Sequence, residues 1–159
     1  MMGIHFMDEV PFKDVYIHAL VLDEKGKKMS KSVGNVINPL EVIEEYGTDA
    51  LRFTLTALSV AGRDLRMAKT RVEGYRNFAT KIWNAARFAE MNEATAPADF
   101  DPRQNKLTLN RWIVSELSKA VQATDTALST YSFNEAAEAA YQFVWNNFCD
   151  WYVEFAKPI

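Results

Sequence analysis

Residues 26–35, GKKMSKSVGN, bring together the side chains and the glycines that proteins use to bind phosphate. Lys28 and Lys31 carry mobile ammonium groups with three donors each, which suit phosphate oxygens. Ser30 and Ser32 add hydroxyl donors, and the flanking glycines let the backbone bend and approach a ligand closely. A loop of this composition suits phosphoryl or nucleotidyl transfer, in which negative charge grows on a leaving pyrophosphate.

A simpler interpretation competes with this one, because most lysine-rich turns are solvated surface loops. The segment is not a P-loop, since the pattern G-x-x-x-x-G-K-[ST] does not occur in it. Met29 stands between the lysines and the serines. We expect its apolar side chain to anchor the loop to the protein body while the lysines stay in solvent.

Residues 14–23, DVYIHALVLD, are rich in β-branched and aromatic side chains and predict a strand that leads into the loop. After the loop, apolar periodicity predicts helices to the end of the chain, at residues 39–46, 50–59, 69–91, 109–130 and 133–156. Residues 92–106 contain two prolines and lack apolar periodicity, which predicts a long loop. The fold class is therefore mainly α, with a helical bundle preceded by a strand and a loop.

Several residues predict where these helices begin and end. Asn38 followed by Pro39 is typical of a helix N-terminus, and Gly47 is typical of the residue after a helix. We expect Thr48 or Asp49 to cap the second helix. The last helix is preceded by a capping box, in which a serine at position 132 is followed by a glutamate at position 135.

Projected at ~100° per residue, the longer helices divide into apolar and polar faces. The apolar stripe of the helix at 69–91 comprises Tyr75, Phe78, Ala79, Ile82, Ala85, Ala86 and Ala89, and its opposite face carries Arg76, Asn77, Thr80, Lys81, Asn84, Arg87 and Phe88. The stripe at 109–130 comprises Ile113, Leu117, Ala120, Val121, Thr124 and Leu128. That of the last helix comprises Ala137, Ala140, Tyr141, Val144, Phe148, Trp151 and Phe155.

Phe88 and Val153 are apolar residues on otherwise polar faces. Two interpretations stay open: a neighbouring helix buries these faces, or nucleic-acid bases stack on them beside the basic residues. The charge distribution bears on this choice. Residues 63–87 hold seven basic residues against two acidic ones, whereas residues 107–159 hold three basic against six acidic. A polyanion is therefore expected at the middle of the chain, although the net charge is −3.

The composition is that of a globular protein, with 48% hydrophobic and 25% charged residues over 159 positions. No apolar run approaches the ~20 residues that cross a bilayer, and the first residues do not resemble a signal peptide. Cys149 is the only cysteine, and no Cys/His cluster could hold zinc. We therefore expect a cytoplasmic location, no membrane contact and no metal site in this chain.

The segment Lys28–Ser32 is identical to KMSKS, a signature of class I aminoacyl-tRNA synthetases. The run GKKMSKSVGNVINPLEVIEEYGTDALRFTL resembles the segment that follows this signature in the valyl, isoleucyl and leucyl enzymes. Further segments resemble the valyl enzymes in particular: MMGIHFMDEVPFKDVYIH, RVEGYRNFATKIWNAARFAEM and FVWNNFCDWYVEFAKP. The resemblance covers the chain apart from residues 92–106. The alternatives are an isoleucyl or leucyl enzyme, or a non-catalytic helical tRNA-binding module.

The resemblance implies a division of labour. Residues 1–35 would end a Rossmann-like catalytic domain with the signature loop, residues 36–68 would form a stem-contact helical region, and residues 69–159 would begin a helical anticodon-binding domain. Lys31, assisted by Lys28, would contact the phosphates of ATP, which is a substrate accompanied by Mg²⁺. Ser30 and Ser32 would complete the catalytic loop.

The resemblance also implies the partners, tRNA(Val), ATP and valine. The candidate tRNA-binding residues are Arg76, Lys81, Asn84, Arg87, Phe88 and Val153. The family's other catalytic signature, His-x-Gly-His, is absent, because His5 and His18 have neither its spacing nor its glycine. The valine pocket would also lie outside this sequence, so we expect the isolated chain to be inactive.

Overall fold

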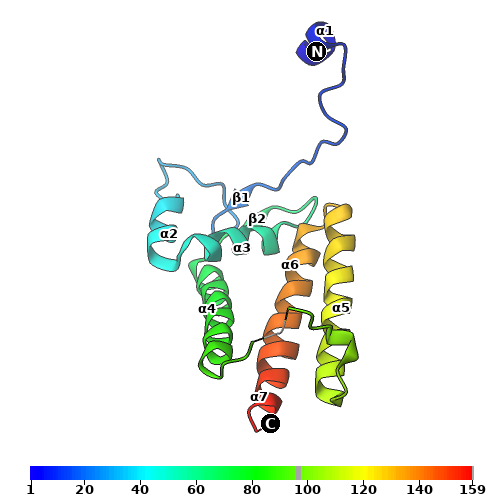
Figure 1. Cartoon of the computed structure of the whole chain (residues 1–159). Coiled ribbons are helices and arrows are strands. Elements are labelled where there is room, and N and C mark those ends of the chain that lie inside the picture. Colours follow the sequence, from blue (N-terminus) through cyan, green and yellow to red (C-terminus); the bar gives the residue numbers. More distant parts are fainter. Residues whose placement is uncertain (96–97, 159) are drawn as a thin grey trace.

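The computed structural model describes residues 1–95 and 98–158, and it confirms a mainly α fold (Figure 1). An N-terminal arm that begins with α1 (Met2–Met7) extends away from the body. It leads to a layer formed by α2 (Pro39–Tyr46), α3 (Thr48–Leu58) and two short strands, β1 (Val21–Leu22) and β2 (Leu65–Arg66). Residues 96 and 97 of the predicted loop at 92–106 lie outside the described residues.

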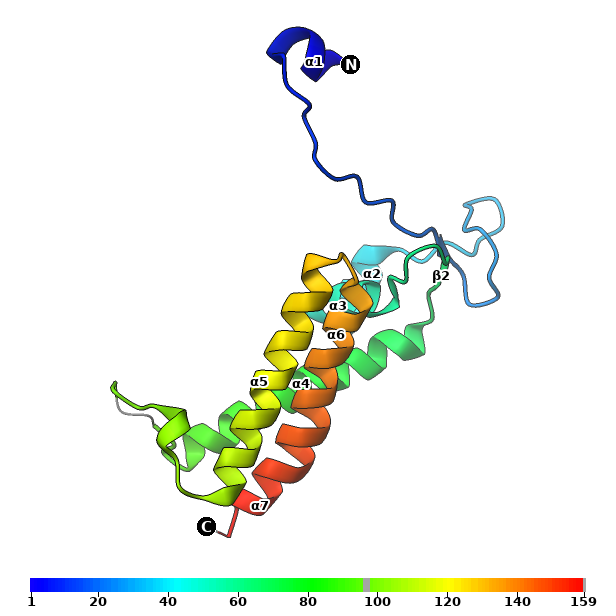
Figure 2. The same ribbon diagram turned by 90° about the vertical axis from the view of Figure 1, so that its right-hand side faces the viewer.

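The C-terminal half of the chain forms a helical bundle. Its elements are α4 (Lys69–Met91), the 3₁₀ turn η1 (Pro102–Gln104), α5 (Thr108–Ser129), α6 (Phe133–Gln142), the π-helical segment η2 (Phe143–Val153) and α7 (Glu154–Ala156). Figure 2 shows α5 and α6 running side by side, while α4 crosses behind them. None of the helices in the described parts of the chain is both long and apolar enough to cross a membrane.

The strand predicted at residues 14–23 is wrong for most of its length. Only Val21 and Leu22 form a strand, and they pair in parallel with β2. A β-strand persists only where a neighbour accepts and donates its backbone hydrogen bonds, and β2 offers two residues. The β-branched side chains before β1 are consequently exposed, with Val15 and Ile17 at 79% and 84% of their full accessible area.

A small core joins the layer to the start of α4. Its buried residues come from α2, α3, β2 and α4, and they are Val42, Ala50, Leu51, Leu65, Met67 and Val72. The predicted start of α2 is confirmed, because the Asn38 side chain accepts a hydrogen bond from the backbone N–H of Leu40. The predicted cap of α3 is wrong. α3 begins directly after Gly47, so neither Thr48 nor Asp49 precedes the helix as a cap.

Aromatic rings fill the centre of the bundle. Phe53 of α3 packs on Phe78 of α4 with ring centroids 5.2 Å apart, and Phe78 packs on Tyr141 of α6 at 4.7 Å. Tyr141 stacks on Trp145 of η2 at 5.6 Å. Aromatic pairs at such distances contribute ~0.5–1.5 kcal/mol beyond the area that they bury. This series of rings therefore fixes the first half of α4 against α3 and α6.

The last predicted helix is helical throughout but changes its hydrogen-bond pattern. From Phe143 to Val153 the backbone is π-helical, so that its hydrogen bonds join residues five apart and not four apart as in an α-helix. A projection at 100° per residue therefore fails beyond Phe143, and Trp151 and Phe155, predicted in the core, are more than half exposed. The capping box before this helix is also wrong, because the Ser132 side chain makes no capping hydrogen bond.

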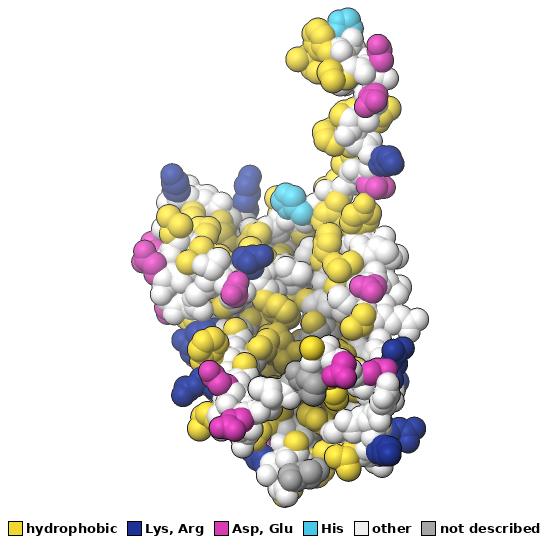
Figure 3. All heavy atoms as spheres, in the orientation of Figure 1, with side chains coloured by type: hydrophobic (Ala, Val, Ile, Leu, Met, Phe, Trp, Pro, Cys, Tyr) yellow, Lys and Arg dark blue, Asp and Glu magenta, His cyan; other side chains and the backbone are white. Residues whose placement is uncertain are grey.

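The other two predicted apolar stripes are only partly buried. In α4, Phe78 is buried, but Ala79 is exposed and Ile82 is 43% exposed. In α5, Ile113 is buried, whereas Leu117, Val121 and Leu128 are exposed. For Ile82 and Leu117 the reason is an apolar groove of ≈530 Å³ between α4, α5 and η2, which both residues line. Figure 3 shows hydrophobic side chains on this face of the molecule.

Candidate functional site

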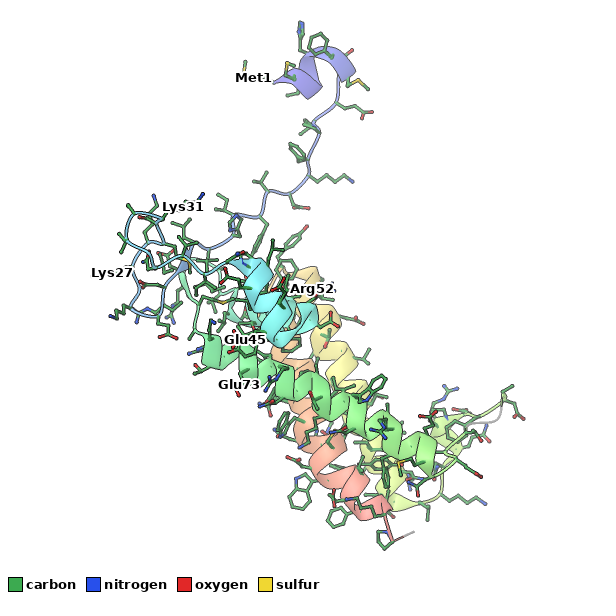
Figure 4. All side chains as sticks on the ribbon, turned by 90° about the vertical axis from the view of Figure 1, so that its left-hand side faces the viewer. Met1, Lys27, Lys31, Glu45, Arg52 and Glu73 are labelled. Atoms are coloured by element: carbon green, nitrogen blue, oxygen red, sulfur yellow. The ribbon has the colours of Figure 1, made fainter. Side chains whose placement is uncertain are left out.

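The candidate phosphate-binding loop, residues 26–35, connects β1 to α2 and projects from the body (Figure 4). It begins with a turn in which the N–H of Gly26 donates to the carbonyl of Asp23 at 2.9 Å. Gly26 has a φ of 74°, which favours glycine, and a Cβ atom there would also lie 3.1 Å from Nε of the Arg66 side chain. Met29 packs against the small core, which confirms that it anchors the loop.

Two side chains hold the first half of the loop in place. Nδ2 of Asn35 donates to Oδ2 of Asp23 at 2.9 Å and to the carbonyl of Lys28 at 3.2 Å. Oδ1 of Asn35 accepts from the N–H of Ser30 at 2.9 Å. The N–H of Lys27 donates to Oδ1 of Asp23 at 2.7 Å. These bonds, which we call the Asp23–Asn35 clasp, fix the backbone on both sides of Met29.

The second half of the loop is a tight turn that makes its own hydrogen bonds. The carbonyl of Ser30 accepts from the N–H groups of Val33 and Gly34, both at 3.2 Å. The hydroxyl groups of Ser30 and Ser32 lie 2.7 Å apart. Gly34 has a φ of 73°, which favours glycine. These bonds close the turn, and Figure 4 shows Lys31 at its outer end, pointing away from the helices.

Both signature lysines are exposed. Within the described residues, neither the Lys28 nor the Lys31 ammonium group forms an ion pair. By contrast, Lys69 on α4 is paired with Glu45 of α2 at 2.8 Å. An ammonium group without a protein carboxylate partner can donate to phosphate without first breaking an ion pair. The predicted site residues Lys28, Ser30, Lys31 and Ser32 thus lie together on one loop at the surface.

Beside the loop lies a hollow of ≈430 Å³, lined by Asp23, Glu24, Lys25, Lys27, Val33, Asn35, Ile37 and Lys69. The hydrogen bonds that Asp23 accepts from the Asn35 side chain and from the Lys27 backbone lower the pKa of its carboxyl group below the ordinary value. Asp23 is therefore ionised at neutral pH. In the described part of the chain, no three His, Cys, Asp or Glu residues are grouped as metal ligands would be.

The candidate tRNA-binding residues on α4 are already in contact with other side chains. Lys81 forms an ion pair with Asp150, and its ammonium group lies 4.1 Å from the ring centroid of Trp145. The Arg76 guanidinium lies 5.7 Å from the ring centroid of Tyr46. These two cations therefore also stabilise the fold, and an anion that recruits them has to compete with the protein.

The remaining candidates lie toward the C-terminal end of α4 and in η2. Asn84 and Arg87 are exposed. Phe88 is half-buried, and the Lys157 ammonium group lies 6.0 Å from its ring centroid. Val153 is half-buried as well. The assignment of these residues to tRNA binding stays a prediction.

Comparison with known proteins gives two family matches along the chain. Residues 1–68 match the family model of tRNA synthetases class I (I, L, M and V), and residues 110–159 match that of the anticodon-binding domain of tRNA ligase. Over its whole length the chain is 66% identical to the valine–tRNA ligase of Rhodopseudomonas palustris and 60% identical to that of Brucella suis. The chain belongs to the class I tRNA synthetase family.

The chain corresponds to a limited part of such a synthetase. It spans 17% of the length of the Rhodopseudomonas relative and 18% of that of the Brucella relative. The Bartonella quintana valine–tRNA ligase, at 57% identity, is likewise covered over 18% of its length. The activity, the substrates and the partners of a whole synthetase are therefore proposals for this chain.

A solved structure supports the class I synthetase fold. The chain superposes with a TM-score of 0.73 on LeuRS in a ternary complex from Agrobacterium radiobacter K84, described as LeuRS–tRNA–LeuAMS. The superposition covers 86% of this chain and 18% of LeuRS, at 22% sequence identity. At that identity the likeness concerns the fold alone. Sequence reasoning found the signature lysines and serines of this site but missed Asp23 and Asn35, which are ordinary turn residues until the fold brings them together.

Proposed function

We propose that this chain supplies the ATP-phosphate loop and the first tRNA-binding helices of a valine–tRNA ligase. The observation that carries the proposal is the identity of 57–66% with valine–tRNA ligases over the whole chain. The exposed, unpaired state of Lys28 and Lys31 in the described structure agrees with it. Under this proposal, residues 1–35 belong to the catalytic domain, residues 36–68 to the stem-contact region and residues 69–159 to the anticodon-binding domain.

The loop acts in the activation of valine. A valine carboxylate oxygen attacks the α-phosphorus of ATP, the bond from that phosphorus to the oxygen bridging to the β-phosphate breaks, and pyrophosphate leaves. Negative charge grows on the leaving pyrophosphate, and donors aimed at it accelerate the step. Figure 4 shows Lys31 at the outer end of the loop, and Lys28 is exposed as well, so both are free to donate to this charge. Mg²⁺ accompanies ATP as part of the substrate.

The helices act in the second step, in which the valyl group passes to tRNA(Val). The match of residues 110–159 to an anticodon-binding domain supports an RNA partner, and the described neighbour is a complex with tRNA. Exposed basic residues on α4 would bind backbone phosphates, which fixes the register of the RNA but does not read its sequence. A cytoplasmic location is the natural one for this role.

The proposal is tested with a hybrid ligase, in which this chain replaces the matching segment of the Rhodopseudomonas palustris enzyme. We expect the hybrid to catalyse valine-dependent exchange between pyrophosphate and ATP and to charge tRNA(Val). A hybrid that folds but catalyses neither reaction would contradict the proposal. Charging with the isolated chain as the added protein is the matched control, and we expect none.

Two alternatives make different predictions. If the chain were a segment of a leucyl or isoleucyl enzyme, it would fit poorly into the valine enzyme. A hybrid in which it replaces the matching segment of the Agrobacterium LeuRS would then be more active than the hybrid with the valine enzyme. A non-catalytic tRNA-binding module would give a hybrid that binds tRNA but shows no exchange. The identities over the whole chain favour the valine assignment.

A further inference from the structure

The Asp23–Asn35 clasp, which lies outside the KMSKS pentapeptide, connects the two ends of the signature loop. Asp23 precedes the loop and Asn35 ends it, yet their side chains meet at 2.9 Å. Asn35 uses both of its polar atoms and binds the backbone at Lys28 and at Ser30, at 3.2 and 2.9 Å. The clasp therefore controls the backbone direction with which the chain enters the outer turn.

Contacts other than the clasp already fix two parts of the loop, namely Met29 and the outer turn. Met29 is fixed by the core, and the outer turn is closed by the backbone hydrogen bonds to the Ser30 carbonyl. Neither contact alone defines the angle between the turn and the body, because Met29 precedes the Ser30 N–H group and the turn follows it. The bond from that N–H group to Asn35 supplies the missing constraint.

We propose that Asp23 and Asn35 are positioning residues that orient the signature turn so that Lys31 reaches the pyrophosphate in the transition state. This inference rests on the proposed function of the loop. Neither residue touches the reacting atoms. Their effect is on the rate of the chemical step, since a misplacement of about 1 Å lowers rates by up to roughly 10²-fold.

The hybrid ligase carries the test in pyrophosphate exchange. Asn35→Ala is expected to lower kcat roughly 10- to 100-fold and to leave KM for valine unchanged. Asp23→Asn and Asn35→Asp each break part of the clasp, the first by removing an acceptor and the second by placing two carboxylates together. Gln122→Ala, an exposed amide on α5, is the matched control and is expected to retain full activity.

The decisive variant combines Asp23→Asn with Asn35→Asp. The new amide at position 23 can donate to the new carboxylate at position 35, which can still accept from the Ser30 N–H group. Only the bond to the Lys28 carbonyl is lost. We expect this double variant to recover most of the activity that the single variants lose, whereas residues of merely structural importance would give losses that multiply. Single variants with full activity, or a double variant that is worse than both, would overturn the inference.

A second measurement separates this inference from the proposed function. The loop contains lysines at positions 27, 28 and 31, so trypsin reports its order in the 159-residue chain itself. Asn35→Ala is expected to accelerate cleavage in the loop at least tenfold relative to Gln122→Ala, while cleavage elsewhere is unchanged. If the unmodified hybrid is inactive, the proposed function fails. If cleavage is the same in both variants, the clasp inference fails.

Discussion

At the scale of single residues, the loop divides its side chains between two tasks. Met29 and Asn35 face the protein, since the former packs against the core and the latter forms hydrogen bonds, while Lys28 and Lys31 face solvent. A cation that is held in place but not neutralised by a carboxylate is a suitable donor for charge that appears only during a reaction. The transition state, and not the bound substrate, is therefore expected to depend on Lys31.

Replacing Lys31 tests this dependence. In the hybrid ligase, Lys31→Ala is expected to lower the rate of pyrophosphate exchange by ~10²–10³, which is the usual cost of losing one such donor. Valine binding is expected to change little, because under the proposed function the lysine acts on the leaving pyrophosphate and not on the amino acid. Exchange kinetics at saturating valine measure the effect, and near-normal exchange would exclude the role.

The ionisation of Asp23 gives a prediction for the pH dependence of the loop. Its folded-state pKa is lowered by hydrogen bonds from Asn35 and Lys27, so ionisation stabilises the loop above the unfolded value of about 3.9. This stabilisation is lost as the pH falls through the lowered pKa. The charged groups that line the same hollow are Glu24, Lys25, Lys27 and Lys69.

NMR of the 159-residue chain can follow this titration at the Asn35 side-chain amide. We expect its signals to be constant from pH 8 to about 5 and to shift with a midpoint below 3.9. Asp23→Asn serves as the control. In this variant the shift of the Asn35 signals that Asp23 causes should be absent, whereas a shift caused by the neighbouring Glu24 would persist. A midpoint at or above the ordinary carboxyl value would show that the clasp does not form.

At the scale of elements, the presence of the long helices was predictable from local periodicity, whereas their caps were predictable only in part, since the cap at Asn38 is confirmed and the caps at Thr48 or Asp49 and at Ser132 are wrong. Features that depend on distant partners were not predictable. Asn38 with Pro39 marks the start of α2 correctly, because a cap acts within one turn of the chain. The strand at 14–23 failed because its length depends on β2, and the stripes of α4 and α5 failed at the groove that both helices line. The clasp between Asp23 and Asn35 was missed for the same reason, because it depends on the turn between them.

The C-terminal end of α4 offers a test of stacking against packing. If a tRNA base stacks on Phe88, Phe88→Ala and Phe88→Leu are both expected to raise KM for tRNA in the hybrid ligase, since a stacked base contributes ~1–3 kcal/mol. Pyrophosphate exchange is expected to be unchanged. If Phe88 only packs against its neighbours, Phe88→Leu keeps the apolar volume and behaves as the unmodified hybrid. Kinetics of tRNA charging distinguish the two outcomes.

At the scale of the whole molecule, the chain holds its loop and its helices together but leaves wide apolar surfaces uncovered. The groove between α4, α5 and η2 has a volume of ≈530 Å³ and is lined by apolar side chains. The N-terminal arm exposes further apolar residues above the body (Figure 3). Surfaces of this extent are typical of sites where other protein segments pack.

This incompleteness predicts weak nucleotide binding. Ligand pockets enclose most of the surface of the ligand, whereas the residues that line the hollow beside the loop come from residues 23–37 and from Lys69 of α4. We expect calorimetry to detect little or no binding of ATP to the 159-residue chain and clear binding to the hybrid ligase. Micromolar affinity in the isolated chain would indicate that it contains a more complete nucleotide site.

The parallel pairing of β1 with β2 also sets an order of events when the chain folds. Residues 23–64, which include the signature loop, α2 and α3, lie between the two strands. Helices form within about a microsecond from contacts between neighbours, whereas joining distant strands first costs the entropy of closing the long loop between them. We therefore expect α2 and α3 to form before the strands meet. The lysines of the signature loop then take up their final arrangement in the last step, and they are the first to lose it when β1 separates from β2.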